Sequence, residues 1–222
     1  MPFFDRDEAG QRLAKTLRRY RRQRPVVLAL PRGGVAVAAP IARALAAPLD
    51  LLIVRKIGVP GQPELAMGAI VDGAEPLVVH NQQVIATLGI SDKEFGEVRD
   101  RELAEIERRR RLYLANRSFP DIAGRTVIVV DDGIATGATM KAALEALRTR
   151  RPRRLVMAVP VAPKDTLEEL RPLADDVICI ESQAAFMAIS AYYIKFDQVS
   201  DAEVIDTLAA FPPGDAGTAA GT

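Results

Sequence analysis

The segment VIVVDDGIATGATM, residues 127–140, holds the residues best suited to chemistry. Four apolar β-branched residues, typical of a buried parallel strand, run directly into Asp131 and Asp132. A loop of small residues and threonines follows, and its backbone N–H groups and the next helix N-terminus can hold an anion. Carboxylates would repel that anion but accept hydrogen bonds from hydroxyl groups. The segment therefore predicts a ribose 5-phosphate site, with an ordinary polar strand–turn–helix corner as the alternative.

The same segment closely resembles the motif that binds phosphoribosyl pyrophosphate (PRPP) in type I phosphoribosyltransferases. It contains neither the GK[ST] of a P-loop nor a GxGxxG fingerprint. The resemblance implies that Asp131 and Asp132 hold the ribose hydroxyls and stabilise the positive charge that develops on the ring during transfer. Gly133 departs from the family, which usually has an aliphatic residue there. The implied 5-phosphate cradle consists of Ala135, Thr136, Gly137, Ala138 and Thr139.

Two cationic segments stand where this family places its pyrophosphate-binding groups. The sequence PRGG, residues 31–34, follows the first predicted strand, and the pair Arg55–Lys56 follows the second. Taken alone, RGG more often marks a plain tight turn, and the pair could be charges at a strand end. The resemblance implies that the leaving pyrophosphate is bound by Arg32, Gly33, Gly34, Arg55 and Lys56, with Arg32 and Lys56 as the catalytic cations.

The sequence gives weaker evidence for the acceptor-binding site than for the PRPP-binding site. In the family's purine enzymes an aromatic residue after the last strand stacks on the base, and Phe186 occupies a similar place. Phe186 and Tyr192 are therefore the candidate acceptor-binding residues, with plain hydrophobic core as an equally weighted alternative. Tyr193 replaces an aspartate that helps to hold a metal in those enzymes. Ala135 replaces their acid–base aspartate, so hypoxanthine and guanine are poor candidates for the acceptor.

The resemblance implies Mg²⁺ as the cofactor, bridging pyrophosphate and ribose oxygens of PRPP. Mg²⁺ usually keeps water and substrate oxygens as ligands, so no protein cage is expected beyond contacts from Asp131 and Asp132. The resemblance also implies a loop, residues 57–72, that closes over the site and excludes water. Glu64 in this loop could be an acid or base, or more simply an exposed carboxylate. His80 is the single histidine, which excludes a His-based triad or metal cluster.

Strands and helices alternate around these motifs. Apolar runs predict parallel strands at 26–30, 49–54, 126–130, 154–161 and 177–180, and the intervening patterns predict helices at about 5–22, 137–150 and 164–173. A last short helix begins near Ser200. We therefore predict an α/β fold, a Rossmann-like parallel sheet flanked by helices.

An insertion, residues 57–124, interrupts this alternation. KIGVPGQPE is expected to be a Gly/Pro loop, and AMGAIVDGAEPLVVHN to be two strands around a DGAEP turn. A long polar helix follows, and Ser91 with Glu94 fits a capping box at its start. We expect one domain over residues 1–210, with this hairpin-plus-long-helix subdomain inserted as the family's flexible loop. Residues 211–222 have the composition of a disordered tail.

The composition is that of an ordinary soluble protein. Apolar residues make up 49% of the 222 residues and charged residues 27%. Lys+Arg 30 against Asp+Glu 29 leaves no basic excess, which makes nucleic acid an unlikely partner. Prolines, glycines and charges interrupt the most apolar stretch, so no membrane span is expected. A single cysteine, Cys179, suits a reducing cytosol and predicts a cytoplasmic protein.

The leading hypothesis is a magnesium-dependent pentosyltransferase, a glycosyltransferase that moves the 5-phosphoribosyl group from PRPP to a nucleobase or similar small nucleophile and releases pyrophosphate. One alternative is a PRPP-sensing regulator with an RNA, DNA or protein partner, and another is a hydrolase that uses water as the acceptor. Asp131, Asp132, Arg32 and Lys56 together favour turnover. The chain as a whole resembles a subgroup known only as predicted phosphoribosyltransferases, which implies a donor but no acceptor. The family alone suggests a homodimer.

Overall fold

A five-stranded parallel sheet forms the centre of the computed structural model, which describes residues 2–73, 75–114, 117–184 and 186–211. Its spatial order is β2-β1-β6-β7-β8. The strands are β1 (Val26–Ala29), β2 (Leu49–Leu51), β6 (Thr126–Val130), β7 (Arg154–Pro163) and β8 (Asp176–Gln183). Every residue of β1, β2 and β6 is buried, because helices cover both faces. The predicted α/β fold is confirmed.

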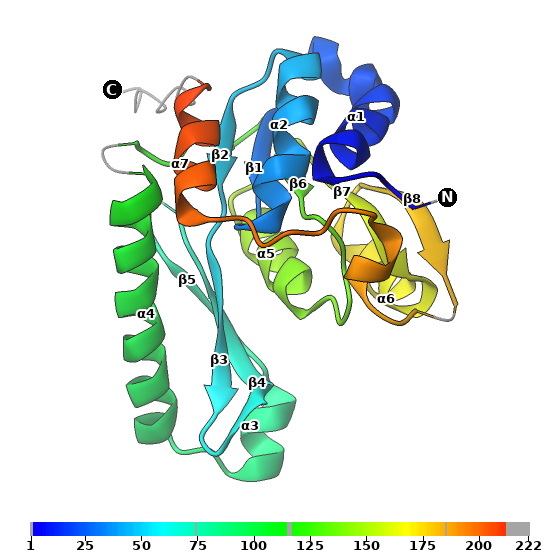
Figure 1. Cartoon of the computed structure of the whole chain (residues 1–222). Coiled ribbons are helices and arrows are strands. Elements are labelled where there is room, and N and C mark those ends of the chain that lie inside the picture. The colour runs from blue at the N-terminus through cyan, green and yellow to red at the C-terminus, as the bar shows by residue number, and fades with distance from the viewer. Residues whose placement is uncertain (1, 74, 115–116, 185, 212–222) are drawn as a thin grey trace, which may run out of the picture.

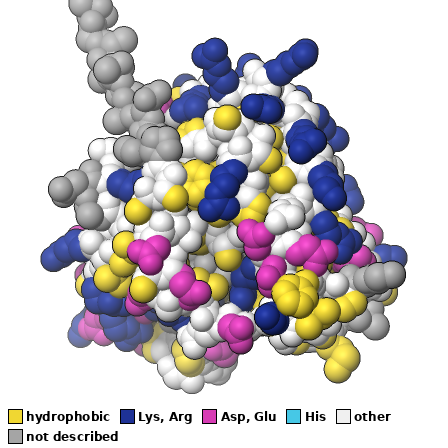
Figure 2. Space-filling model, turned by 45° about the horizontal axis from the view of Figure 1, so that its top comes forward, with side chains coloured by type: hydrophobic (Ala, Val, Ile, Leu, Met, Phe, Trp, Pro, Cys, Tyr) yellow, Lys and Arg dark blue, Asp and Glu magenta, His cyan; other side chains and the backbone are white. Residues whose placement is uncertain are grey.

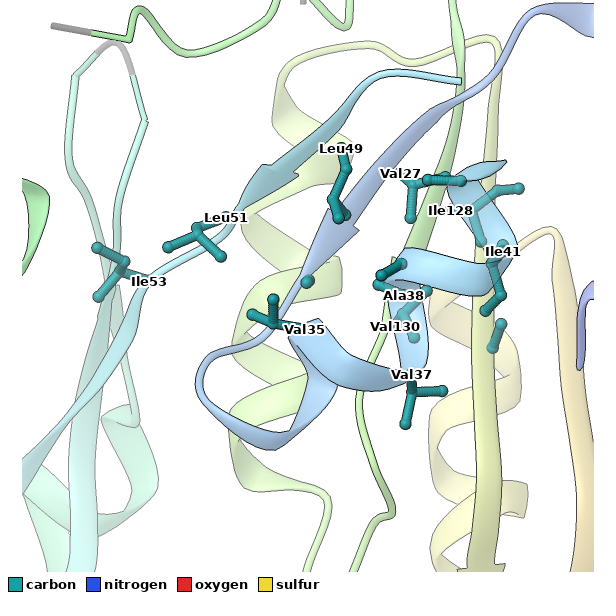
Figure 3. Packing of buried hydrophobic residues seen from close by; sticks show 14 of the residues in the cluster. Val27, Val35, Val37, Ala38, Ile41, Leu49, Leu51, Ile53, Ile128 and Val130 are labelled. Atoms are coloured by element: carbon teal, nitrogen blue, oxygen red, sulfur yellow. The ribbon is translucent and has the colours of Figure 1, made fainter. Parts of the chain in front are cut away.

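Helices form a layer on each face of the sheet (Figure 1). One face packs against α1 (Arg6–Leu17), α2 (Gly33–Leu45) and α7 (Asp201–Ala209), and the other against α5 (Ala138–Thr149) and α6 (Lys164–Leu170). Alternate residues of β1 belong to the two cores, Val27 to the first and Leu28 to the second. Figure 3 shows the first core, in which strand residues Val27, Leu49, Leu51, Ile128 and Val130 surround α2 residues Val35, Ala38 and Ile41.

The insertion is a structured arm that extends from the body (Figure 1). A second sheet, antiparallel and of order β3-β4-β5, is built from β3 (Val54–Val59), β4 (Gln62–Val71) and β5 (Leu77–His80). It is followed by α3 (Gln82–Leu88) and α4 (Asp92–Leu114). The His80 ring stacks on Phe95 of α4 with centroids 4.6 Å apart, and Ile57 and Met67 are fully buried.

Two sequence predictions in this region were wrong. The Gly/Pro segment after Lys56 is not a loop, because β3 and β4 continue through it and only a tight turn at Pro60–Gly61 separates them. Gly61 takes a positive φ of 78° there, which glycine adopts without strain. The predicted strand 49–54 is divided, since β2 ends at Leu51 and β3 starts at Val54 in the other sheet.

Other boundaries follow the predictions closely. The capping box predicted at Ser91 forms, because the Ser91 hydroxyl accepts from the Glu94 N–H at 3.3 Å. A second capping box joins Ser200 and Glu203 at the start of α7. The first predicted helix continues past α1 as the 3₁₀ turn η1 (Arg18–Gln23), and two more turns are η2 (Arg171–Leu173) and η3 (Ile189–Tyr192).

The chain's last described residue, Phe211, is 7% exposed and belongs to the first core. The rest of the predicted tail, 212–222, lies outside the described residues. Within the described part of the chain, no helix combines the length and apolarity needed to cross a membrane. Figure 2 shows Lys and Arg side chains in the upper part of this face and also at its lower left, and acidic side chains mainly in its lower half.

Candidate functional site

The acidic pair lies directly after β6, at the carboxyl edge of the parallel sheet, where such sheets bind ligands. Asp131 Oδ1 accepts a hydrogen bond from the Asp132 N–H at 2.8 Å. Burial, and then the charge of Asp132, raise the pKa of Asp131 well above its ordinary value. The hydroxyl of Tyr193 donates to the Asp132 carbonyl oxygen at 2.6 Å. These contacts fix the Asp131 carboxylate and the backbone of Asp132.

The predicted phosphate cradle is an open loop at the start of α5. Gly137 is buried with φ at 76°, while the other four cradle residues, Ala135, Thr136, Ala138 and Thr139, are exposed. A Cβ on Gly137 would lie 2.7 Å from Thr166 Cγ2, so both the space and the backbone require glycine. The Thr166 hydroxyl donates to the Ala135 carbonyl at 3.2 Å and holds the loop. No side chain caps α5, so its first N–H groups are available to an anion.

The loop 31–34 packs directly against the acidic pair. A Cβ on Gly33 would lie 1.9 Å from Asp132 Oδ2, and one on Gly34 would lie 2.8 Å from the Val130 carbonyl oxygen. Both glycines are therefore required by the close approach of the two loops. The Pro31–Arg32 peptide bond in this loop is cis. Arg32 extends from the loop, with Nη1 3.4 Å from Asp201 Oδ1 of α7.

Arg55 and Lys56 lie on β3, at the base of the arm. Arg55 Nη2 is 2.6 Å from Glu102 Oε2 of α4, and Lys56 Nζ is 3.1 Å from Glu64 Oε2. A cleft of about 720 Å³ between the β3–β4 hairpin and α4 is lined by both cations. Their polar partners thus belong to the arm, and Glu64, which is 99% exposed, is one of them.

Aromatic side chains gather beyond the acidic pair. The rings of Phe186 and Tyr192 stack with centroids 5.3 Å apart, and both are half-buried. Tyr193 is 7% exposed and packs against Phe3 at 5.4 Å, so its ring belongs to a small core. The substitution at Gly133 also has a reason here, because a Cβ would lie 2.6 Å from Ile189 of η3. Glycine lets this aromatic segment approach the end of β6.

Comparison with known proteins identifies this arrangement. Residues 6–196 match the family described as "Phosphoribosyl transferase domain". The chain belongs to the phosphoribosyl transferase family. The matched residues include the acidic pair, the cradle, the 31–34 loop and the whole arm, so the resemblance read from the sequence is confirmed.

Relatives of this chain occur in two strains of Mycobacterium tuberculosis, CDC 1551 and H37Rv. Each is named provisionally as a phosphoribosyl transferase and is 42% identical over 206 residues, which are 93% of this chain and 46% of the relative. The chain therefore spans about half the length of the curated relatives it matches. The crystal structure of TT1426 from Thermus thermophilus superposes with a TM-score of 0.78 at 40% identity, covering 95% of this chain and 99% of that one.

The oxygen ligands at the site fit a magnesium ion that keeps most of its coordination shell for water and substrate oxygens. Among the described residues, no group of three or more histidine, cysteine, aspartate or glutamate side chains is placed to hold a metal ion. The hard oxygens at the site are the carboxylates of Asp131 and Asp132, of which Asp132 Oδ2 already accepts a bond. Two carboxylates can supplement substrate oxygens and water but do not form a complete shell.

Three residues at this site carry no local signal in the sequence. Arg6, the first residue of α1, donates from Nε to Asp132 Oδ2 at 2.7 Å. Asp201 Oδ1 accepts from the Tyr113 hydroxyl at 2.5 Å and also faces Arg32. Each contact joins residues that are 88 or more positions apart in the chain. Sequence reasoning placed these residues only in helices, because no short motif contains both partners.

Proposed function

We propose that this phosphoribosyl transferase moves the 5-phosphoribosyl group from PRPP to a nucleobase or similar small nucleophile and releases pyrophosphate. The observation that carries the proposal is the contact between two loops from neighbouring strands, in which Asp132 Oδ2 lies 1.9 Å from where a Cβ of Gly33 would stand. The contact brings a pair of carboxylates, suited to ribose hydroxyls, next to a loop suited to pyrophosphate. Phosphate, ribose and pyrophosphate subsites are thereby contiguous.

The donor would bind with its 5-phosphate on the cradle and its ribose hydroxyls on the acidic pair. The exposed hydroxyls of Thr136 and Thr139 and the free N–H groups of α5 are the phosphate donors. Asp131 and Asp132 accept from the 2- and 3-hydroxyls, and their charge stabilises the oxocarbenium character of the ring in the transition state.

The pyrophosphate would leave C1 into the cationic loop 31–34. Arg32 is 34% exposed in its side chain, so a ligand can reach it. When bound, Mg²⁺ would be held by Asp131, Asp132 and substrate oxygens and would neutralise charge on the leaving group. Arg32, on loop 31–34, and Lys56, on the arm, would add positive charge beside the leaving pyrophosphate.

The arm would act as the closing element. Arg55 and Lys56 now contact Glu102 and Glu64, so pyrophosphate has to replace these carboxylates as their partner. Because the hairpin packs on α4, closure would move a folded hairpin and would exclude water from the site. This replaces the free loop expected over 57–72.

The acceptor would lie against the Phe186–Tyr192 stack, whose flat faces suit a planar base. Ala135 offers no acid or base to the acceptor, so proton transfer would involve another group, such as Glu64, water or the acceptor itself. A planar nucleophile whose reacting nitrogen is readily deprotonated therefore fits better than a 6-oxopurine.

The test is phosphorus NMR of PRPP with Mg²⁺ and the protein, in the presence and absence of pooled purine and pyrimidine acceptors. The proposal expects pyrophosphate that depends on an acceptor, and division of the pool then identifies that acceptor. The variant Asp131→Asn with Asp132→Asn should lose transfer while keeping the far-ultraviolet circular dichroism of the wild type.

Other spectra would contradict this function. Pyrophosphate formed without an acceptor would indicate hydrolysis, and PRPP resonances that shift without turnover would indicate a sensor. Unchanged PRPP resonances would refute the donor site altogether. Unchanged turnover in the double variant would refute the role of the acidic pair.

A further inference from the structure

Arg6 is a shielded cation inside the candidate donor site. Its Nε donates to Asp132 Oδ2 at 2.7 Å, and its Nη1 donates to the Asp197 carbonyl oxygen at 2.7 Å. The guanidinium lies 3.8 Å from the centroid of the Phe196 ring. The side chains of Arg6 and Asp132 are only 12% and 14% exposed, unlike an ordinary surface ion pair.

The position of this cation matters because of the charges around it. The oxygen that Arg6 contacts, Asp132 Oδ2, is also the atom closest to the Gly33 position of the pyrophosphate loop. Arg6 therefore lies where the predicted ribose and pyrophosphate subsites meet. A polyanionic donor has to approach two adjacent carboxylates at this point, and opposing charge at short range is strong where solvent is restricted.

Each of the other candidate cations forms an ion pair with an acidic side chain outside the acidic pair. Arg32 faces Asp201, Arg55 faces Glu102, and Lys56 faces Glu64. Arg6 also faces an acidic partner, but that partner is a member of the acidic pair itself. Its Nη2 makes no hydrogen bond to any acceptor in the part of the chain that the structure describes. The planar guanidinium can therefore donate from Nη2 to an oxygen of a ligand while Nε keeps its hydrogen bond to Asp132.

We propose that Arg6 is a further donor-binding residue, which offsets the charge of the acidic pair and donates from Nη2 to an oxygen of bound PRPP. This inference rests on the proposed function. Through Phe196 and Asp197, Arg6 also connects α1 to the segment that follows the aromatic stack. The same side chain thus positions the ribose clamp and anchors the segment next to the acceptor side.

The test is the affinity for the Mg²⁺ complex of PRPP, measured by isothermal titration calorimetry. Arg6→Gln should weaken binding at least about tenfold, because a charge-assisted hydrogen bond and a neighbouring positive charge are both lost. Arg6→Lys keeps the charge but not the fork, and should recover part of the affinity.

Arg12→Gln is the matched control. Arg12 lies on the same helix, pairs with Glu181 at 3.5 Å and covers the Phe3 ring at 4.5 Å, so its replacement also removes one charge and one aromatic contact. Its affinity for the donor should stay within about twofold of the wild type, as for other partly exposed pairs.

Each further outcome decides the question. Equal weakening in both variants would overturn the proposal as a general charge effect. Tighter binding by Arg6→Gln would show that Arg6 obstructs the site. A wild-type protein that binds no PRPP would overturn the proposed function as well, whereas wild-type binding with an unaffected Arg6→Gln variant would overturn only the role of Arg6.

Discussion

Replacing Gly33 by alanine should both impair the proposed donor site and destabilise the fold. The new Cβ would stand 1.9 Å from Asp132 Oδ2 and 2.4 Å from its Cγ, where real contacts essentially never fall below 3.0 Å. The carboxylate must therefore move by about 1 Å, and a misplacement of that size in a reacting site costs about 100-fold in rate. The same movement separates Asp132 from Arg6. Loss of that shielded, charge-assisted bond should lower the free energy of unfolding by about 1.5–3 kcal/mol.

The assay has two parts, pyrophosphate release for function and urea unfolding for stability. Gly96→Ala is the control, because only Arg99 lies within 4 Å of its Cβ position, at 3.9 Å, and the helical backbone accepts alanine. That change should stabilise the protein by about 0.4–1 kcal/mol. A double-mutant cycle between Gly33→Ala and Arg6→Gln should show non-additive losses, differing by about 0.5–3 kcal/mol from the sum, because both changes break one bond. A Gly33→Ala variant with wild-type turnover, or a fully additive cycle, would refute the reasoning.

Three further predictions follow from contacts near the site. Tyr193→Phe should cost about 1–3 kcal/mol in urea unfolding, since it leaves the Asp132 carbonyl without its 2.6 Å donor; an unchanged midpoint would contradict this. The Tyr113 hydroxyl, and then Arg32, hold the pKa of Asp201 below its ordinary value of 3.8, so its stabilisation is complete above that pH and lost as the pH falls through the lowered pKa. Asp201→Asn should flatten the fall in stability below the ordinary pKa of 3.8, and an unchanged fall at acid pH would count against the contact. Burial raises the pKa of Cys179 to about 11, so a disulfide reagent at neutral pH should label the native thiol far more slowly than the unfolded one.

The parallel sheet was predictable because its strands are buried on both faces. Continuous apolar runs such as 126–130 have no solvated side and differ clearly from helices in length. A loop was predicted where β3 and β4 pair, because these strands are partly exposed and lack a continuous apolar run. The proline and glycine at the hairpin turn also favoured a loop. Strand pairing, not local composition, decides such a segment.

The candidate site likewise contains residues that could be predicted from the sequence and residues that could not. The loop after the acidic pair was predictable, since the positive φ of Gly137 is a local backbone requirement that a motif encodes, whereas the side chain that Gly33 has to avoid, Asp132, lies far along the chain. Arg6 was not, because its importance depends on a partner 126 positions away. Arg55 and Lys56 were recognised as cations, but their present partners could not be read without knowing that β3 faces α4.

The bond from Arg6 to the Asp197 carbonyl joins positions 191 apart in the chain, nearly the full length of the domain. Closing so large a loop is entropically unfavourable until the intervening elements are already folded. During synthesis the acidic pair emerges well before Phe196 and Asp197, so a nascent or truncated chain holds a ribose clamp that lacks its anchored cation. If Arg6 binds the donor as proposed, full affinity for PRPP arises only after the segment that follows the aromatic stack has folded back onto α1. A chain truncated before that segment, or cleaved within it, would then bind PRPP more weakly than the intact chain.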